Sequence, residues 1–92
     1  MIGYLNNTDK SVLESFPVCI IGAGAAGISL AIKLSRQGKK VLIIEGGDWQ
    51  ETPEVVDAYV GNASAPHPQT TEFRYQRFGG TTHLWGGRCV PL

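Results

Sequence analysis

The feature that most constrains this chain is a glycine-rich turn between an apolar run and an amphipathic stretch. Gly22-Ala23-Gly24-Ala25-Ala26-Gly27 reads GxGxxG. The preceding run, Val18–Ile21, is apolar throughout, which is typical of a strand buried on both faces of a parallel sheet. Residues 25–35 then place small and branched apolar side chains on one helical face, and Gly38 can end that helix in a left-handed conformation. With a second apolar run at Val41–Ile44, the sequence predicts a strand–helix–strand unit and an α/β fold with a parallel sheet.

A GxGxxG turn between a strand and a helix is the dinucleotide-binding arrangement of Rossmann-type folds. Gly22 permits the tight turn, Gly24 lets the backbone approach a pyrophosphate, and Gly27 lets the helix pack closely on the strand. The free N–H groups of the helix N-terminus favour phosphate binding. Glu45 follows Gly27 by 18 residues and, at the end of the second strand, can accept hydrogen bonds from an adenosine ribose. The pattern therefore predicts a dinucleotide site.

A second glycine-rich segment lies near the end of the chain. Gly79-Gly80 and Gly86-Gly87 place two glycine pairs in nine residues, as a backbone needs if it is to lie against a flat ring and a diphosphate. Thr81 and Thr82 between them offer uncharged hydroxyl donors. A plain glycine-rich hairpin is the alternative, in which Trp85 fills the space that the glycines leave.

These two segments resemble those of a known family. The spacing from Gly27 to Glu45 resembles the extended fingerprint of FAD-binding Rossmann domains. Residues 78–87, FGGTTHLWGG, resemble the flavin-binding loop of the glucose–methanol–choline (GMC) oxidoreductases, and Glu45-Gly46-Gly47 is similar to the end of that family's second strand. Trp85, where Asn is more usual, points toward a pyranose-oxidase-like branch. The resemblance implies FAD as cofactor and hydride transfer to the flavin from a CH–OH group of a sugar or other alcohol.

The sequence and the resemblance together predict a set of cofactor-binding residues: Gly22, Gly24, Ala25, Ala26, Gly27, Glu45, Gly46, Gly79, Gly80, Thr81, Thr82, Trp85, Gly86 and Gly87. No residue of the chain is predicted to be catalytic, because the base of GMC enzymes lies near their C-terminus. In some sugar oxidases of the family a histidine of this loop carries the flavin covalently. That position is Leu84 here, one residue after His83, so we expect FAD to be held non-covalently.

Two other functions stay open. An NAD-binding Rossmann dehydrogenase explains residues 22–45 but leaves residues 79–87 unexplained. A non-catalytic nucleotide-binding or interaction fragment is the second alternative.

The expected organisation is an N-terminal fragment with an incomplete sheet. Residues 1–16 form a polar lead and residues 17–92 the N-terminal part of an FAD-binding domain: a βαβ unit at 17–47, a short helix and loop at 48–72, and the flavin-binding loop at 78–92. Thr52 is expected to cap the short helix and Gly61 to end it. Such a fragment is expected to be inactive alone. Its expected partners are an alcohol or sugar substrate and the rest of the same enzyme or a complementary chain.

Composition narrows the partners further. Eight basic and eight acidic residues give zero net charge, which argues against nucleic acid or a membrane surface as partner. No apolar run approaches the roughly 20 residues of a membrane span. Cys19 and Cys89 have no metal-ligand spacing, and Cys19 is expected to be buried as a small apolar side chain. Without a signal-like start, the expected location is the cytoplasm.

Overall fold

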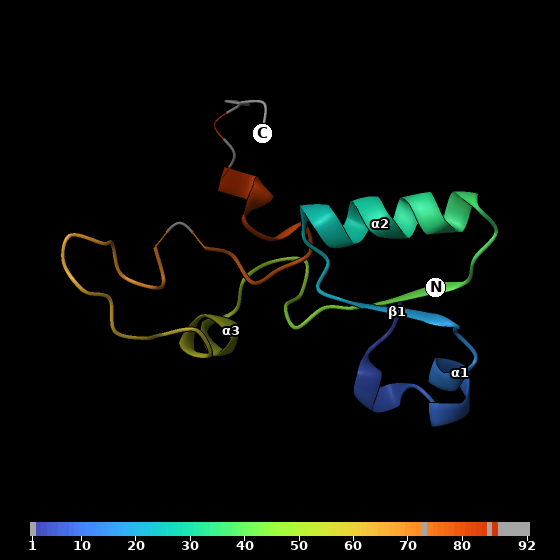
Figure 1. Cartoon of the computed structure of the whole chain (residues 1–92). Coiled ribbons are helices and arrows are strands. Elements are labelled where there is room, and N and C mark those ends of the chain that lie inside the picture. The colour runs from blue at the N-terminus through green and yellow to red at the C-terminus, as the bar shows by residue number, and fades with distance from the viewer. Residues whose placement is uncertain (1, 73, 85, 87–92) are drawn as a thin grey trace.

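The computed structural model describes residues 2–72, 74–84 and 86, and its regular centre is one βαβ unit (Figure 1). Strand β1 (Val18–Ile21) leads into helix α2 (Ala25–Arg36) and then into strand β2 (Val41–Ile44). The two strands pair in parallel, with Val18 opposite Val41 and Ile21 opposite Ile44. The predicted α/β fold with a parallel Rossmann-type sheet is therefore confirmed.

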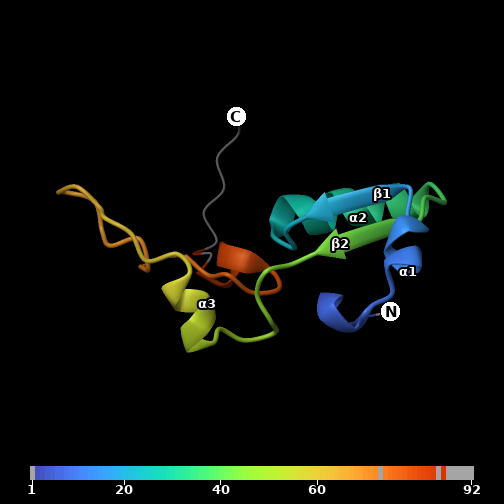
Figure 2. The same cartoon turned by 90° about the horizontal axis from the view of Figure 1, so that it is seen from below.

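Helix α2 covers one face of the two-stranded sheet, and Figure 2 shows the strands side by side with α2 behind them. The packing is close at the start of the helix. A Cβ atom placed on Gly27 would lie 2.1 Å from the Gly22 carbonyl oxygen and 3.4 Å from a methyl carbon of Ile20. At the other end, Gly38 has a φ of 77° and ends the helix in the left-handed conformation that the sequence predicts. Glycine at these two positions thus sets where the helix lies and where it stops.

The sequence predicts strands that are buried on both faces, but the face of β1 that points away from α2 is exposed. Side chains alternate between the faces of a strand, and along β1 they alternate between half-buried and exposed. Ile20 lies on the side of α2, whereas Ile21 is 88% exposed. Cys19 is also exposed, so the prediction of a buried thiol is wrong for this structure. The reason is that α2 shields a single face of β1.

The N-terminal lead carries two short helices that the sequence analysis did not predict. They are the 3₁₀ helix η1 (Leu5–Asn7) and helix α1 (Lys10–Glu14), and both lie on the side of the sheet away from α2 (Figure 1). Lys10 Nζ lies 3.3 Å from Glu14 Oε1, one helical turn away. Both side chains are exposed, so this pair adds little stability.

The predicted short helix is shorter than expected. Helix α3 spans Pro53–Asp57 and is capped by Ala58, so Gly61 does not end it. Gly61 instead donates its N–H to Thr70 Oγ1 at 2.7 Å and closes the loop that follows. Thr52 stands at the N-cap as predicted, but its side chain makes no capping hydrogen bond. None of the described helices combines the length and apolar character that a membrane crossing requires.

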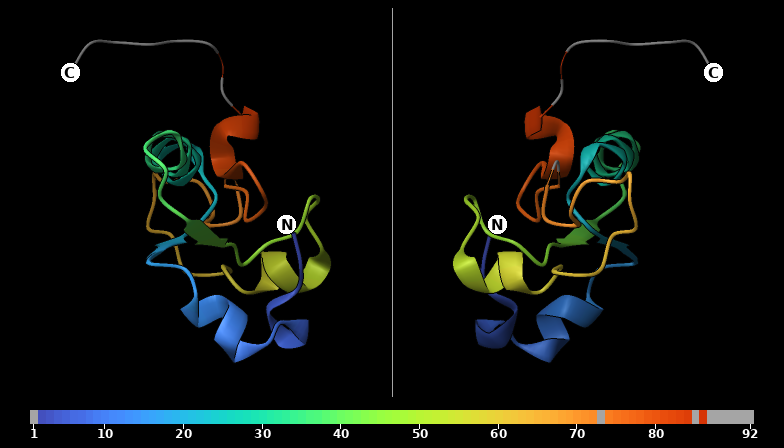
Figure 3. Two further views of the ribbon diagram at one scale, coloured as in Figure 1. Left: turned by 90° about the vertical axis from the view of Figure 1, so that its right-hand side faces the viewer. Right: turned by 90° about the vertical axis from the view of Figure 1, so that its left-hand side faces the viewer.

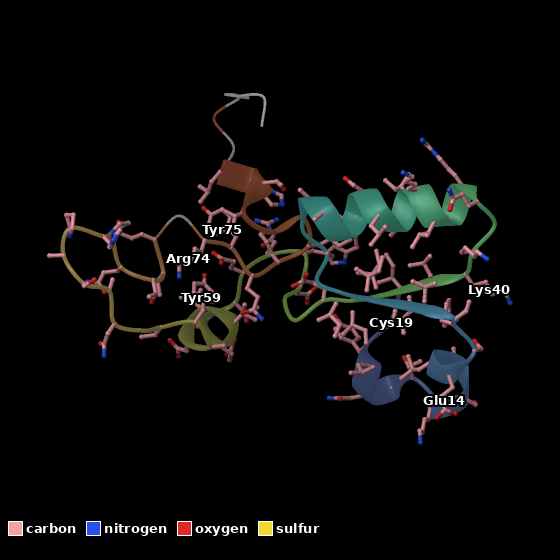
Figure 4. The ribbon with its side chains drawn as sticks, in the orientation of Figure 1. Glu14, Cys19, Lys40, Tyr59, Arg74 and Tyr75 are labelled. Carbon is pink, nitrogen blue, oxygen red and sulfur yellow. The ribbon has the colours of Figure 1, made fainter. Side chains whose placement is uncertain are left out.

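Tyr59 fixes the start of this loop. Its hydroxyl donates to Glu51 Oε1 at 2.6 Å, which raises the pKa of Tyr59 to about 12. The Arg74 carbonyl oxygen lies 3.3 Å from the same hydroxyl. Figure 4 shows Tyr59, two residues after the end of α3, reaching toward the segment of Arg74 and Tyr75. The two ends of the loop therefore lie close together. The chain that follows the loop, residues 74–80, lies beside the βαβ unit.

We expect Gly27→Ala to destabilise the protein. Helix propensity alone favours alanine by about 1 kcal/mol, but the new Cβ would meet a backbone oxygen that cannot rotate away. Overpacking of this kind costs about 1–3 kcal/mol, so the net free energy of unfolding should fall, as denaturant titration of the intact protein can measure. Gly3→Ala is the control, because the nearest atom to its Cβ would be 3.7 Å away. An equal or higher stability for Gly27→Ala would contradict this packing.

Candidate cofactor-binding site

The first glycine segment forms a turn that opens toward solvent in front of α2. Gly22 has a φ of 97° and donates its N–H to the Ile44 carbonyl at 2.7 Å. Gly24 is the N-cap of α2 and has no side chain that could accept from the N–H groups of the first turn. Apart from residues 23–25 themselves, no described residue has an atom within 4 Å of where a Cβ on Gly24 would be. The turn thus presents helix N–H donors to an open space, the arrangement that binds a phosphate.

The Glu45 carboxylate joins this turn to the end of β2. Its Oε2 accepts from the Ala23 N–H at 2.6 Å, and its Oε1 accepts from the Gly47 N–H at 2.9 Å. Both bonds are partly buried. An ionised carboxylate has about four lone-pair positions, so two are left for the hydroxyls of a ribose. Glu45 can therefore shape the site and bind a ligand at the same time.

The second glycine segment lies against the first. Gly79 donates its N–H to the Ala23 carbonyl at 2.8 Å, and a Cβ on Gly80 would lie 3.5 Å from the Cα of Gly24. Gly79 and Gly80 have φ values of 88° and 58°, which favour glycine at both positions. Figure 3 shows the 3₁₀ helix η2 (Gly80–Leu84) beside α2. The structure thus brings together two predicted segments that are more than 50 residues apart in the sequence.

Residues 75–80, which lead into the second glycine segment and include its first glycine pair, are here called the strap, and they also cross the turn that follows Glu45. The Phe78 N–H donates to the Asp48 carbonyl at 3.0 Å, and the Phe78 and Trp49 ring centroids are 4.8 Å apart. A Cβ on Gly47 would lie 2.0 Å from the Gln76 carbonyl oxygen. The strap therefore contacts both the first glycine segment and the turn that follows Glu45. The second contact is possible only because Gly47 has no side chain.

Two side chains of η2 donate hydrogen bonds to backbone carbonyls directly before this helix. The Thr82 hydroxyl donates to the Gly79 carbonyl, and Nε2–H of His83 donates to the Phe78 carbonyl at 3.0 Å. Thr81 Oγ1 accepts from the Tyr75 N–H at 3.3 Å and keeps its own proton for a ligand. Of the two predicted hydroxyl donors, Thr81 is therefore the one that can bind a cofactor in this conformation.

The remaining predicted residues fall into three groups. Ala25 and Ala26 are exposed in the first turn of α2, where their N–H groups belong to the phosphate-binding end. A Cβ on Gly46 would lie 2.6 Å from Gln76 Nε2, so Gly46 packs against the strap. Gly86 is exposed, and no described residue comes within 4 Å of where its Cβ would be, whereas Trp85 and Gly87 lie outside the described residues.

Three further residues contribute to this site and were not among the predicted ones: Gln76, Arg77 and Trp49. Arg77 donates from its guanidinium to the Trp49 carbonyl. The one local signal was that Trp49 lies two residues after the Gly46-Gly47 pair, because a large ring can fill the space that glycines leave.

We expect Glu45→Gln to weaken FAD binding by about 1.5–3 kcal/mol, the usual contribution of a hydrogen bond to a charged group. The amide has one acceptor oxygen in place of two, so it cannot accept from both Ala23 and Gly47 and still bind a ribose. Fluorescence titration of the intact apoprotein with FAD gives the dissociation constant. Asp48→Asn is the control, since Asp48 lies in the same turn and its side chain binds only the adjacent Trp49 N–H. Equal FAD affinity for Glu45→Gln and the wild type would contradict the ribose role.

Comparison with known proteins gives the family. The family described as FAD dependent oxidoreductase (DAO) matches residues 17–77, which is more than half of the chain. The chain is 33% identical over 88 residues to the flavin-containing monooxygenase FMO GS-OX-like 5 of Arabidopsis thaliana, covering 89% of this chain and 20% of that protein. It is 40% identical over 52 residues to the squalene monooxygenase of Candida glabrata, covering 56% of this chain and 10% of that protein.

A third relative is the probable oxidoreductase OrdL of Haemophilus influenzae, 50% identical over 34 residues, or 37% of this chain and 8% of that protein. The chain thus spans a fifth or less of the length of these three relatives. No solved structure matches. The match over residues 17–77 contains the whole βαβ unit and Glu45, and it shows that the chain belongs to the FAD-dependent oxidoreductase (DAO) family, with FAD as its cofactor.

Proposed function

We propose that this chain binds the adenosine and pyrophosphate of FAD in an oxidoreductase that oxidises a CH–OH group of a small alcohol or sugar. The observation that carries the proposal is the contact between the two glycine segments, made by the Gly79 N–H and the Ala23 carbonyl at 2.8 Å. Two glycine-lined backbones that meet beside a helix N-terminus and a carboxylate suit a dinucleotide that needs phosphate donors and a ribose acceptor.

The residues present fit FAD. The open space at Gly24 has room for a pyrophosphate, and the N–H groups of Ala25 and Ala26 face it from the uncapped start of α2. Glu45 orients the adenosine by accepting from its ribose, and its negative charge disfavours a 2′-phosphate. A Cβ on Gly80 would lie 3.5 Å from the Gly24 Cα, so glycine at position 80 keeps a side chain out of this neighbourhood. When bound, FAD supplies the acceptor for the electron pair removed from the substrate.

The CH–OH part of the proposal is supported by the resemblance of residues 78–87 to the GMC flavin loop. Oxidation of an alcohol also needs a base for the hydroxyl proton. His83 is a poor candidate, because its Nε2–H is committed to the Phe78 carbonyl within the loop itself. We therefore propose that the base, and with it turnover, comes from residues outside these 92, in the remainder of the same enzyme or a complementary chain.

Monooxygenation is the second candidate, and the names of the relatives favour it: flavin-containing monooxygenases and a squalene monooxygenase. The two reactions differ in their electron balance. Oxidation of an alcohol delivers two electrons from the substrate to the flavin. Insertion of one oxygen atom from O₂ reduces the other atom to water, which consumes two electrons from an external reductant.

The test is the reduction of the flavin without oxygen. We expect one member of a panel of alcohols and sugars to bleach the oxidised-flavin absorbance of the holoenzyme that includes the residues outside these 92, with no nicotinamide nucleotide present. The control is Gly24→Val, whose side chain would occupy the space proposed for the pyrophosphate and which should carry no flavin. Bleaching by NADH or NADPH alone, with no response to any alcohol, would contradict the CH–OH proposal and support monooxygenation.

A further inference from the structure

Arg77 is a half-buried arginine in the strap, placed between the two glycine-rich segments. Its guanidinium donates to the Trp49 carbonyl. Its Nε is buried and finds no hydrogen-bond partner within the described part of the chain. A buried donor without a partner costs free energy. An apolar side chain would fill the same place without that cost, so packing alone is a poor reason for an arginine here.

The arginine side chain adds a hydrogen bond to the turn that follows Glu45. The Gly47 N–H of this turn donates to Glu45 Oε1, and Trp49 follows two residues later. The strap contacts the turn at Gly47 and Asp48 through backbone atoms, which any residue of the strap could supply. The Arg77 guanidinium is different, because its polar contact with the turn comes from a side chain and reaches Trp49.

We propose that Arg77 is a positioning residue for the adenosine end of the cofactor. It holds Trp49, and with it the turn at residues 46–49, so that the Gly47 N–H keeps the Glu45 carboxylate aimed at the ribose. Arg77 has no hydrogen bond to Glu45 and acts only through this turn. The proposal rests on the proposed function, in which Glu45 accepts from the ribose of FAD.

A ratio of affinities tests this more sharply than a single affinity does. The intact apoprotein is titrated with FAD and with the analogue that carries 2′-deoxyadenosine, which lacks one hydroxyl for Glu45 to accept from. We expect the wild type to prefer FAD by about 10- to 100-fold, the factor that one charged hydrogen bond contributes. Arg77→Met keeps the length of the apolar stem and removes the donors. Its preference should fall to about threefold or less, and Arg77→Lys, which keeps a donor, should recover part of it.

Arg74→Met is the matched control, an exposed arginine three residues earlier with the same loss of charge, and it should keep the wild-type preference. A general loss of stability would weaken FAD and its analogue equally and leave the ratio unchanged. If Arg77→Met gives no folded protein, Arg77→Gln replaces it, because its amide ends near the position of Nε and cannot reach Trp49.

Each outcome is decisive. An unchanged preference in Arg77→Met or Arg77→Gln, with a clear preference in the wild type, would overturn the positioning role and leave the FAD site intact. If the wild type binds FAD tightly but does not prefer it over the analogue, Glu45 does not accept from the ribose. That result would also overturn the positioning role of Arg77. A wild type that binds neither nucleotide would overturn the proposed function itself.

Discussion

The pair of hydrogen bonds accepted by the Glu45 carboxylate is the interaction on which the site depends. One bond reaches back to Ala23 in the turn after β1, and the other reaches forward to Gly47. Among the described residues only Ala23 and Ala31 are buried apolar side chains, so a large core does not fix these turns. Hydrogen bonds donated to a charged acceptor are about twice as strong as neutral ones, and here they connect the ends of both strands.

The second constraint is the close approach of backbones. At Gly27 the helix meets the turn, at Gly47 the turn after β2 meets the strap, and at Gly80 the strap meets the first glycine segment. At the first two positions a Cβ would lie within about 2 Å of a carbonyl oxygen, closer than any real contact. The same absence of side chains that lets the chain segments meet leaves the space in front of Gly24 open. Packing and ligand binding thus both require glycine, because each needs a position without a side chain.

The sequence was informative where structure is local. Val18–Ile21, the helix that follows and Val41–Ile44 all carry short-range patterns, and each forms as predicted. The exposure of Cys19 could not be predicted, because an apolar run does not say how many of its faces are covered. The end of α3 was misplaced because Gly61 binds Thr70, nine residues away. The strap and its contact with Trp49 depend on pairs almost 30 residues apart, for which a local pattern has no signal.

We propose that FAD binds where the two glycine segments meet. Amide hydrogen exchange of the intact protein, compared with and without FAD, measures this at both segments in one experiment. We expect slower exchange with FAD in the first turn of α2, at residues 25–27, and at the same time in residues 79–82. Slower exchange at residues 25–27 with no change at residues 79–82 would show that the second glycine segment is not part of the FAD site, and would contradict the account.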